Sequence, residues 1–144
     1  MKVFLDTSVL VASLVSEHPH HTRAMAVVRR ILDGKDQGSI AAHGLAETYA
    51  VLTTLPVTPR IGPETAHKLI AENLLGHLEI VALTAPEYAR LVASLPARAV
   101  TGGTTYDALQ IACAEKASAT RVYTFNVAHF KRIAAQLATR IAAP

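Results

Sequence analysis

The chain has 144 residues, 51% of them hydrophobic and 17% charged, and its formal net charge at pH 7 is +3. This length fits one domain, and a charged share below the usual value of about 25% excludes a disordered chain. The longest uncharged stretches, 7–16 and 48–59, are shorter than the roughly 20 apolar residues that cross a bilayer, so we expect no membrane span.

Strand and helix signals alternate along the chain. An apolar run that ends at Asp6 predicts the first strand, and Thr7 and Ser8 are able to cap the helix that follows. Arg140 begins a short edge strand at the end of the chain. In chain order we expect a strand at 2–6, helices at 9–15 and 20–35, a strand at 38–42, helices at 44–55 and 63–75, a strand at 79–83, helices at 84–95 and 105–117, a strand at 121–124, a helix at 126–138 and a strand at 140–142.

Particular residues set the ends of these helices. Gly34 and Gly76 are expected to stop two of them, and Pro63 suits the first turn of a third. Thr84 and Glu87 have the spacing of a capping box. The segment 97–104, which contains two adjacent glycines, is expected to be the most mobile.

Strands alternating with helices predict an α/β fold of three layers, α/β/α, with a mostly parallel sheet formed by a single domain over 1–144. The lone Cys113 lies in an alanine-rich run and is expected in the core, because one thiol forms no internal disulfide. The apolar surplus predicts a homodimer or another covered surface. Asp6 interrupts the apolar start, which argues against a secretory signal and predicts a cytoplasmic protein.

The charge is uneven. Up to residue 96, eight Lys or Arg face nine acids, whereas residues 97–144 carry six bases and two acids. A basic C-terminal third suits a polyanion such as RNA, although such residues equally form a solvated face.

Three acids stand out because each lies near the start of a predicted helix within an apolar run: Asp6, Glu47 and Asp107. Each alone is explained by the helix dipole or by a turn. Together they suggest more, because the ends of parallel strands and the following helix starts meet at one crevice, where ligands bind.

Carboxylates that converge need a cation between them. Two such charges about 4 Å apart repel by about 4 kcal/mol at an effective dielectric near 20. Oxygen ligands without cysteine favour Mg²⁺ or Mn²⁺ over zinc. These ions position phosphates and activate water, so the predicted chemistry is phosphodiester hydrolysis.

Four segments carry a resemblance. V-F-L-D-T-S, G-L-A-E-T-Y-A-V-L, G-G-T-T-Y-D-A-L-Q-I-A-C-A and Y-T-F-N-V-A-H-F resemble the acid-bearing motifs of PIN-domain ribonucleases, most closely the toxins of VapBC-type toxin–antitoxin pairs. The resemblance implies a PIN-like fold, with Asp6, Glu47 and Asp107 as catalytic, metal-binding carboxylates for Mg²⁺ or Mn²⁺. It also implies an RNA substrate, a homodimer and inhibition by a cognate VapB-like antitoxin.

The chain departs from the family at Asn126, where Asp is common. Asn126 is able to orient a water or to ligate through its carbonyl oxygen, but it is equally suited to cap the final helix. The hydroxyls of Thr7, Ser8 and Thr124 are expected near the crevice, supporting the carboxylates from a second layer.

Other candidates are weaker. The histidines of H-P-H-H, at His18, His20 and His21, are expected to face solvent rather than bind a metal. His43 precedes Glu47 by one helical turn and is able to face the same site. Among the aromatic residues, Tyr49, Tyr106 and Phe130 are suited to base stacking, but the core needs most of them.

Two functions from different classes therefore remain. The first is a metal-dependent endoribonuclease toxin, and the second is a catalytically degenerate PIN domain that binds RNA or a partner without cleaving it. Asn126 is the feature that favours the second. A phosphoryl-accepting receiver would need a second acid beside Asp6, where this chain has Thr7 and Ser8.

Overall fold

A computed structural model describes residues 1–144 and contains one five-stranded sheet. Its strands lie in the order β3-β2-β1-β4-β5, and every neighbouring pair is parallel. The predicted mostly parallel sheet is confirmed and is parallel throughout. The strands are β1 (Lys2–Leu5), β2 (Gln37–Ala41), β3 (Glu79–Val81), β4 (Arg121–Tyr123) and β5 (Ile141–Ala142).

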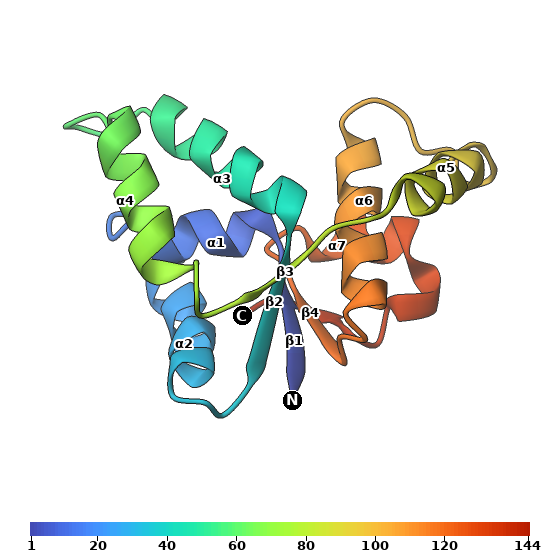
Figure 1. Ribbon diagram of the computed structural model, residues 1–144, viewed down its shortest axis with the longest axis horizontal. Helices are drawn as coiled ribbons and strands as arrows, with labels where there is room; N and C mark the ends of the chain where they lie inside the picture. The colour runs from blue at the N-terminus through green and yellow to red at the C-terminus, as the bar shows by residue number, and fades with distance from the viewer.

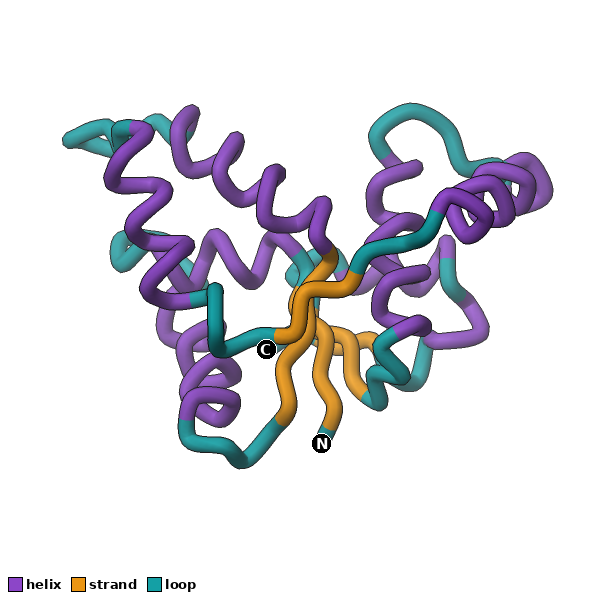
Figure 2. Tube along the Cα trace, viewed as in Figure 1, coloured by secondary structure: helices purple, strands orange, loops and turns teal.

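Helices cover both faces of the sheet, as predicted. Four of them, α1 to α4, lie on one side in Figure 1, and α5 to α7 lie on the other. Figure 2 shows the strands gathered at the base between these two groups, which diverge above the sheet. The helices are α1 (Thr7–Leu14), α2 (His21–Leu32), α3 (Ala42–Thr54), α4 (Pro63–Asn73), α5 (Ala85–Ser94), α6 (Thr104–Lys116) and α7 (Val127–Ile133).

The sheet separates two apolar clusters. Successive side chains of a strand point to opposite faces, so Val3 and Leu5 join the cluster formed with α1 to α4, while Phe4 joins the cluster formed with α5 to α7. All three side chains are fully buried. The sheet is thus buried on both faces, which explains why β1 reads as a continuous apolar run.

Several helix ends follow the predicted signals. Thr84 and Glu87 form the capping box at the start of α5, with each side chain bonded to the other's backbone N–H. Gly34 and Gly76 adopt φ values of 71° and 82° just beyond α2 and α4, which only glycine does without strain. Pro63 is the first residue of α4.

Several predicted helix boundaries were wrong, and α2, for example, ends at Leu32 instead of 35. Helix α1 begins at Thr7, so Asp6 takes the N-cap position and Thr7 and Ser8 lie inside the first turn, where neither caps the helix. Helix α7 ends at Ile133 instead of 138, because the backbone of Ala134 leaves the helical region before a short 3₁₀ helix, Ala135–Leu137.

Two smaller features complete the fold. The segment expected to be mobile begins with a 3₁₀ turn, Pro96–Arg98, and Arg98 donates a hydrogen bond to the carbonyl of Ile133. Cys113 is buried as predicted, and that burial raises the pKa of its thiol to about 11, so it stays protonated. None of the helices combines the length and the apolar character needed to traverse a bilayer.

Candidate active site

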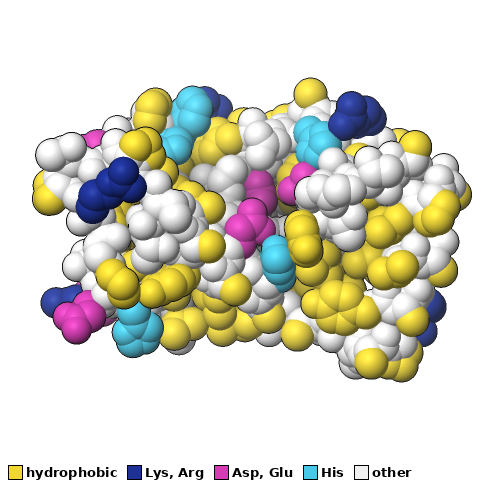
Figure 3. All heavy atoms as spheres, turned by 90° about the horizontal axis from the view of Figure 1, so that it is seen from above, with side chains coloured by type: hydrophobic (Ala, Val, Ile, Leu, Met, Phe, Trp, Pro, Cys, Tyr) yellow, Lys and Arg dark blue, Asp and Glu magenta, His cyan; other side chains and the backbone are white.

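Asp6, Glu47 and Asp107 line one cleft of about 510 Å³ at the carboxyl ends of the strands. Asp6 directly follows β1, Glu47 lies one turn into α3 after β2, and Asp107 lies in the first turn of α6. The side chain of Asn126, which follows β4, lines the same cleft. Seen from above in Figure 3, acidic side chains gather in the hollow between the two halves, with histidines beside them.

Asp6 is the most deeply set of the three acids, with 3% of its surface exposed. Its Oδ2 accepts hydrogen bonds from the hydroxyls of Ser8 and Thr124, each at 2.7 Å. Burial raises the pKa of Asp6, an effect that these two bonds oppose and the charges of Asp107 and Glu47 reinforce. Ser8 and Thr124 thus both bond the same oxygen of Asp6, and Oδ1 keeps no side-chain donor.

Thr7 has a different role from the one expected. Its Oγ1 accepts a bond from Gln110 Nε2 at 2.7 Å, and both side chains are buried. This bond joins the start of α1 to α6, one turn beyond Asp107. Helix α3 packs directly on the pair, because a Cβ placed on Gly44 would lie 3.7 Å from Thr7 Oγ1. Thr7 therefore links the start of α1 to α6, and α3 lies beside that bond.

Glu47 lies beside His43, the residue one turn earlier on α3, with 3.1 Å between Oε2 and Nε2. The His43 ring in turn stacks on Tyr106, with ring centroids 4.9 Å apart and planes within 4°. Tyr106 precedes Asp107 on α6 and is 53% exposed, whereas Phe130 is fully buried in the core. The stack therefore connects the helices that carry Glu47 and Asp107.

Asp107 is held by His129, a residue that the sequence did not single out. His129 Nε2 lies 2.8 Å from Asp107 Oδ2, and Arg132 Nη2 lies 2.8 Å from His129 Nδ1. A guanidinium only donates, so Nδ1 accepts and the ring proton sits on Nε2, where it is donated to Asp107. Both partners come from α7, so this helix orients the carboxylate of α6.

Asn126 does not cap α7. It occupies the N-cap position, but its side chain makes no capping bond. Its backbone N–H is bonded to Thr124 Oγ1 at 2.9 Å, and its carbonyl accepts from Phe130 N. Of the two readings of this residue, the capping one is wrong, and Asn126 is instead one of the residues that line the cleft.

The histidines of the H-P-H-H segment, expected to face solvent, are partly exposed but also make contacts within the chain. His18 Nδ1 accepts a bond from the backbone N–H of His20, and His21 Nδ1 lies 2.9 Å from the Ala12 carbonyl. His20 stacks on Phe125 with centroids 4.4 Å apart. His18 and His20 line the cleft, and burial, with smaller effects from the other two histidines, lowers the pKa of His18.

The donor set suits a hard cation. All three acids offer carboxylate oxygens, and no cysteine lies near them, which matches the ligands of Mg²⁺ and Mn²⁺. No three His, Cys, Asp or Glu side chains are grouped closely enough to enclose one ion, and Glu47 and Asp107 each have a histidine as neighbour. The acids thus share a cleft without forming a closed cage.

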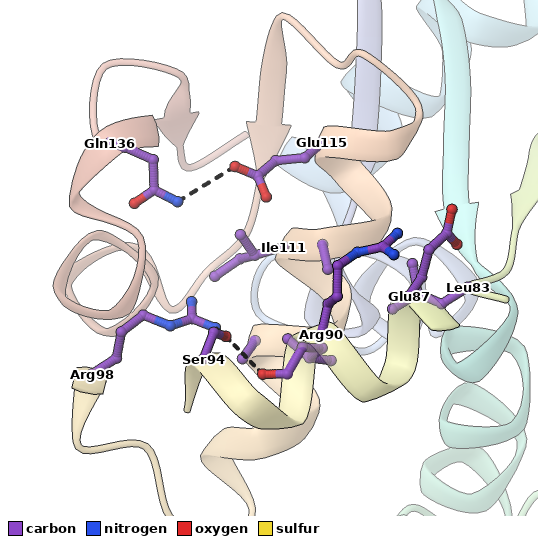
Figure 4. Close-up of a pocket in the computed structure, with 11 residues that line it drawn as sticks. Leu83, Glu87, Arg90, Ser94, Arg98, Ile111, Glu115 and Gln136 are labelled. Atoms are coloured by element: carbon purple, nitrogen blue, oxygen red, sulfur yellow. Dashed lines mark hydrogen bonds between the residues drawn. The ribbon is translucent and has the colours of Figure 1, made fainter. Parts of the chain in front are cut away.

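A second cavity of about 500 Å³ lies between α5 and α6, away from the three acids. Its polar rim is partly satisfied internally (Figure 4): Arg98 Nη2 donates to Ser94 Oγ, and Gln136 Nε2 donates to Glu115 Oε1. Leu83 and Ile111 contribute to its apolar lining. None of the predicted site residues lines it.

Sequence reasoning missed His129 and Gln110, and it named His20 without its stacking partner Phe125. The available signal was helical spacing, because Gln110 lies one turn after Asp107 on one helix, and His129 follows Asn126 by three residues. That spacing does not reveal which distant element each side chain meets.

Comparison with known proteins places these residues in a family. The PIN domain family matches residues 3–136. Ribonuclease VapC40 of Mycobacterium tuberculosis is 39% identical over 104 residues, which cover 72% of each chain. Ribonuclease VapC27 of the same species is 35% identical over 105 residues, covering 73% of this chain and 71% of that protein.

Solved structures share the fold. A crystal structure of M. tuberculosis VapC20, a sarcin–ricin loop cleaving toxin, aligns with a TM-score of 0.64 and 20% identity, covering 93% of this chain and 94% of that one. VapBC2 from Rickettsia felis, bound to a DNA fragment from its promoter, aligns with a TM-score of 0.65 and 23% identity, covering 92% of this chain and 93% of that one. FitAcB from Neisseria gonorrhoeae aligns with a TM-score of 0.59 and 17% identity, covering 91% of this chain and 92% of that one.

Proposed function

The chain belongs to the PIN domain family and, within it, to the VapC-type ribonucleases, and from that premise we propose that it is a metal-dependent endoribonuclease, the toxin of a type II toxin–antitoxin pair. The observation that carries the proposal is the single cleft lined by Asp6, Glu47 and Asp107, which come from three different elements. Carboxylates that line one cleft suit the hydrolysis of a phosphodiester through bound divalent metal.

Within the proposed site, the three carboxylates would hold Mg²⁺ or Mn²⁺, and ribonucleases of this family generally depend on a divalent metal. Such an ion neutralises phosphate charge and lowers the pKa of a bound water. Asp6 would contribute the oxygen that Ser8 and Thr124 leave free, and His129 would keep Asp107 oriented toward the cleft.

Asn126 contributes no charge, so it would leave any second metal weakly held. Its amide on the cleft wall is suited to orient a water or the RNA backbone. We keep as the second candidate a non-cleaving PIN domain that binds RNA or a partner, which the lack of a fourth acid favours.

We further propose a cytoplasmic homodimer that a cognate VapB-like antitoxin inhibits, with RNA as substrate. The apolar composition supports a covered surface, and α5 exposes Tyr88 and Val92, at 43% and 58%. Light scattering at micromolar concentration tests the dimer, and a monomer would refute it.

The deciding experiment is an RNA cleavage assay with purified protein, with Mg²⁺ or Mn²⁺ and with EDTA. Asp107→Asn keeps the side-chain volume and relieves like-charge repulsion, so it should fold and lose cleavage. The matched control is Glu115→Gln, on the same helix but outside the acidic cleft. Sequencing of RNA 5′ ends after brief expression would identify the target.

Cleavage that needs the metal and disappears in Asp107→Asn supports the nuclease. RNA binding without cleavage in either metal would support the second candidate instead. Full activity of purified Asp107→Asn would refute the proposed site.

A further inference from the structure

His20 and Phe125 form a stacked pair on the wall of the carboxylate cleft that the hydrolytic chemistry does not use. Their ring centroids are 4.4 Å apart and their planes 16° apart. Both side chains are partly exposed and both line the cleft that contains the acids. Aromatic surface that remains accessible beside a nucleic-acid-cutting site is suited to stack a base.

Neighbouring residues hold the two rings in place. The Arg23 guanidinium lies 5.6 Å from the centre of the Phe125 ring, and both its Nε and Nη2 donate to the carbonyl of Pro144. His20 is fixed through its backbone, which donates to His18 Nδ1. A surface held in place before binding loses little conformational entropy when a ligand stacks on it.

The pair is also linked to the acids by hydrogen bonds. Ser8 Oγ accepts a hydrogen bond from the backbone N–H of Phe125 at 3.0 Å and donates to Asp6 Oδ2 at 2.7 Å. One hydroxyl therefore links the aromatic pair to the most buried carboxylate. A base stacked on the pair would place its neighbouring phosphate at a defined position relative to Asp6.

We infer that His20 and Phe125 form a stacking subsite for an unpaired nucleobase of the RNA substrate, which fixes the strand relative to the carboxylates. This inference rests on the proposed nuclease function and adds a substrate-positioning role to it. Stacking needs an aromatic ring but not specifically an imidazole. A phenyl ring at position 20 should therefore preserve stacking, whereas it would abolish metal binding or proton transfer by His20.

The test uses 12-nucleotide single-stranded RNAs that carry 2-aminopurine at each position in turn, bound to the full chain in EDTA. His20→Ala should raise the Kd about 5-fold or more, as expected when about 1 kcal/mol of base stacking is lost at 1.4 kcal/mol per factor of ten. His20→Phe should bind within 2-fold of the native chain. His77→Ala, at an exposed histidine outside the cleft, is the matched control.

The fluorescence of 2-aminopurine reports base stacking directly, and a purely structural role of His20 would not change its quenching at one position. At least one 2-aminopurine position should be quenched on binding to the native chain and to His20→Phe, and should stay bright with His20→Ala. His20 makes no side-chain capping bond at the start of α2, so its replacement removes no cap from that helix, and His20→Gln serves as a second ring-less variant.

Native affinity and quenching in His20→Ala and His20→Gln would overturn the subsite. So would a loss in His20→Phe as large as that in His20→Ala, because the imidazole would then be what matters. RNA binding is measured in EDTA, whereas the nuclease proposal is tested by cleavage after Mg²⁺ or Mn²⁺ is added. A lack of cleavage would therefore refute the nuclease proposal without affecting the test of the stacking subsite.

Discussion

His129 donates its Nε2 proton to Asp107 Oδ2 across 2.8 Å, from a helix that begins twenty residues after Asp107 in the chain. Arg132 fixes the tautomer by donating to Nδ1. One oxygen of Asp107 is therefore committed to α7, and the carboxylate has a defined orientation before any ligand enters.

Removing that donor should weaken metal binding. His129→Leu is expected to raise the Mg²⁺ or Mn²⁺ concentration for half-maximal cleavage about 10- to 100-fold, as losses of partners that orient metal ligands do. His129→Gln, whose amide also donates, should raise it less. Metal titration at fixed RNA measures both, and a native midpoint in His129→Leu would show that the bond does not orient Asp107.

The two hydroxyl bonds to Asp6 should contribute to stability. Thr124→Val keeps the shape of this fully buried side chain but removes a donor to Asp6 and an acceptor for the Asn126 N–H. We expect a loss of about 1–3 kcal/mol in the free energy of unfolding, measured by urea denaturation. Thr120→Val removes an exposed hydroxyl bond to Lys2 and should cost less. Equal losses in the two variants would contradict the assignment.

Asn126 should behave as a cleft residue and not as a helix cap. At a true N-cap, replacement by Ala costs about 1 kcal/mol, but Asn126 makes no capping bond, so Asn126→Ala should change stability by less than about 0.5 kcal/mol. Asn126→Asp adds a carboxylate to the cleft and should lower the metal concentration needed for cleavage. Thermal unfolding and metal titration check the two effects, and an unchanged metal requirement in Asn126→Asp would remove the residue from the site.

Acid sensitivity should arise partly at Asp36, whose side chain is 2% exposed and pairs with Arg30 and the N-terminal amine. The hydrogen bond from Arg30 holds the pKa of Asp36 below its ordinary value of 3.8, and the pairing with the amine acts in the same direction. A carboxyl whose folded pKa is depressed stabilises the fold fully above the unfolded pKa and loses that contribution as pH falls through the folded one.

The stability difference between native chain and Asp36→Asn should therefore be constant from neutral pH down to about 5 and shrink below pH 4. Chemical denaturation across this range measures it. A difference that grows on acidification would refute the role of the ion pairs.

Local signals in the sequence were sufficient for most of the fold. Gly34, Gly76, Pro63 and the Thr84–Glu87 capping box act within one or two turns, so their effect is visible in the order of residues. The wrong cap at Asn126 came from the same kind of reasoning. A residue at the N-cap position does not always use its side chain to cap the helix, and local spacing does not show whether it does.

The site was predictable only in part for a related reason. Parallel strands bring their carboxyl ends together, so the convergence of Asp6, Glu47 and Asp107 on one cleft follows from the fold class. The partners of these acids depend on contacts across the chain, such as Thr124 with Asp6 and His129 with Asp107. No periodicity in the sequence encodes such pairs.

The central position of β1 has a consequence for synthesis. The first strand is synthesised first, but its neighbour β4 and the hydroxyl that bonds Asp6 lie more than a hundred residues later. A nascent chain therefore carries Asp6 and Glu47 long before the residues that complete the cleft exist. The cleft is therefore able to form only after Asp107, Thr124 and Asn126 have been synthesised.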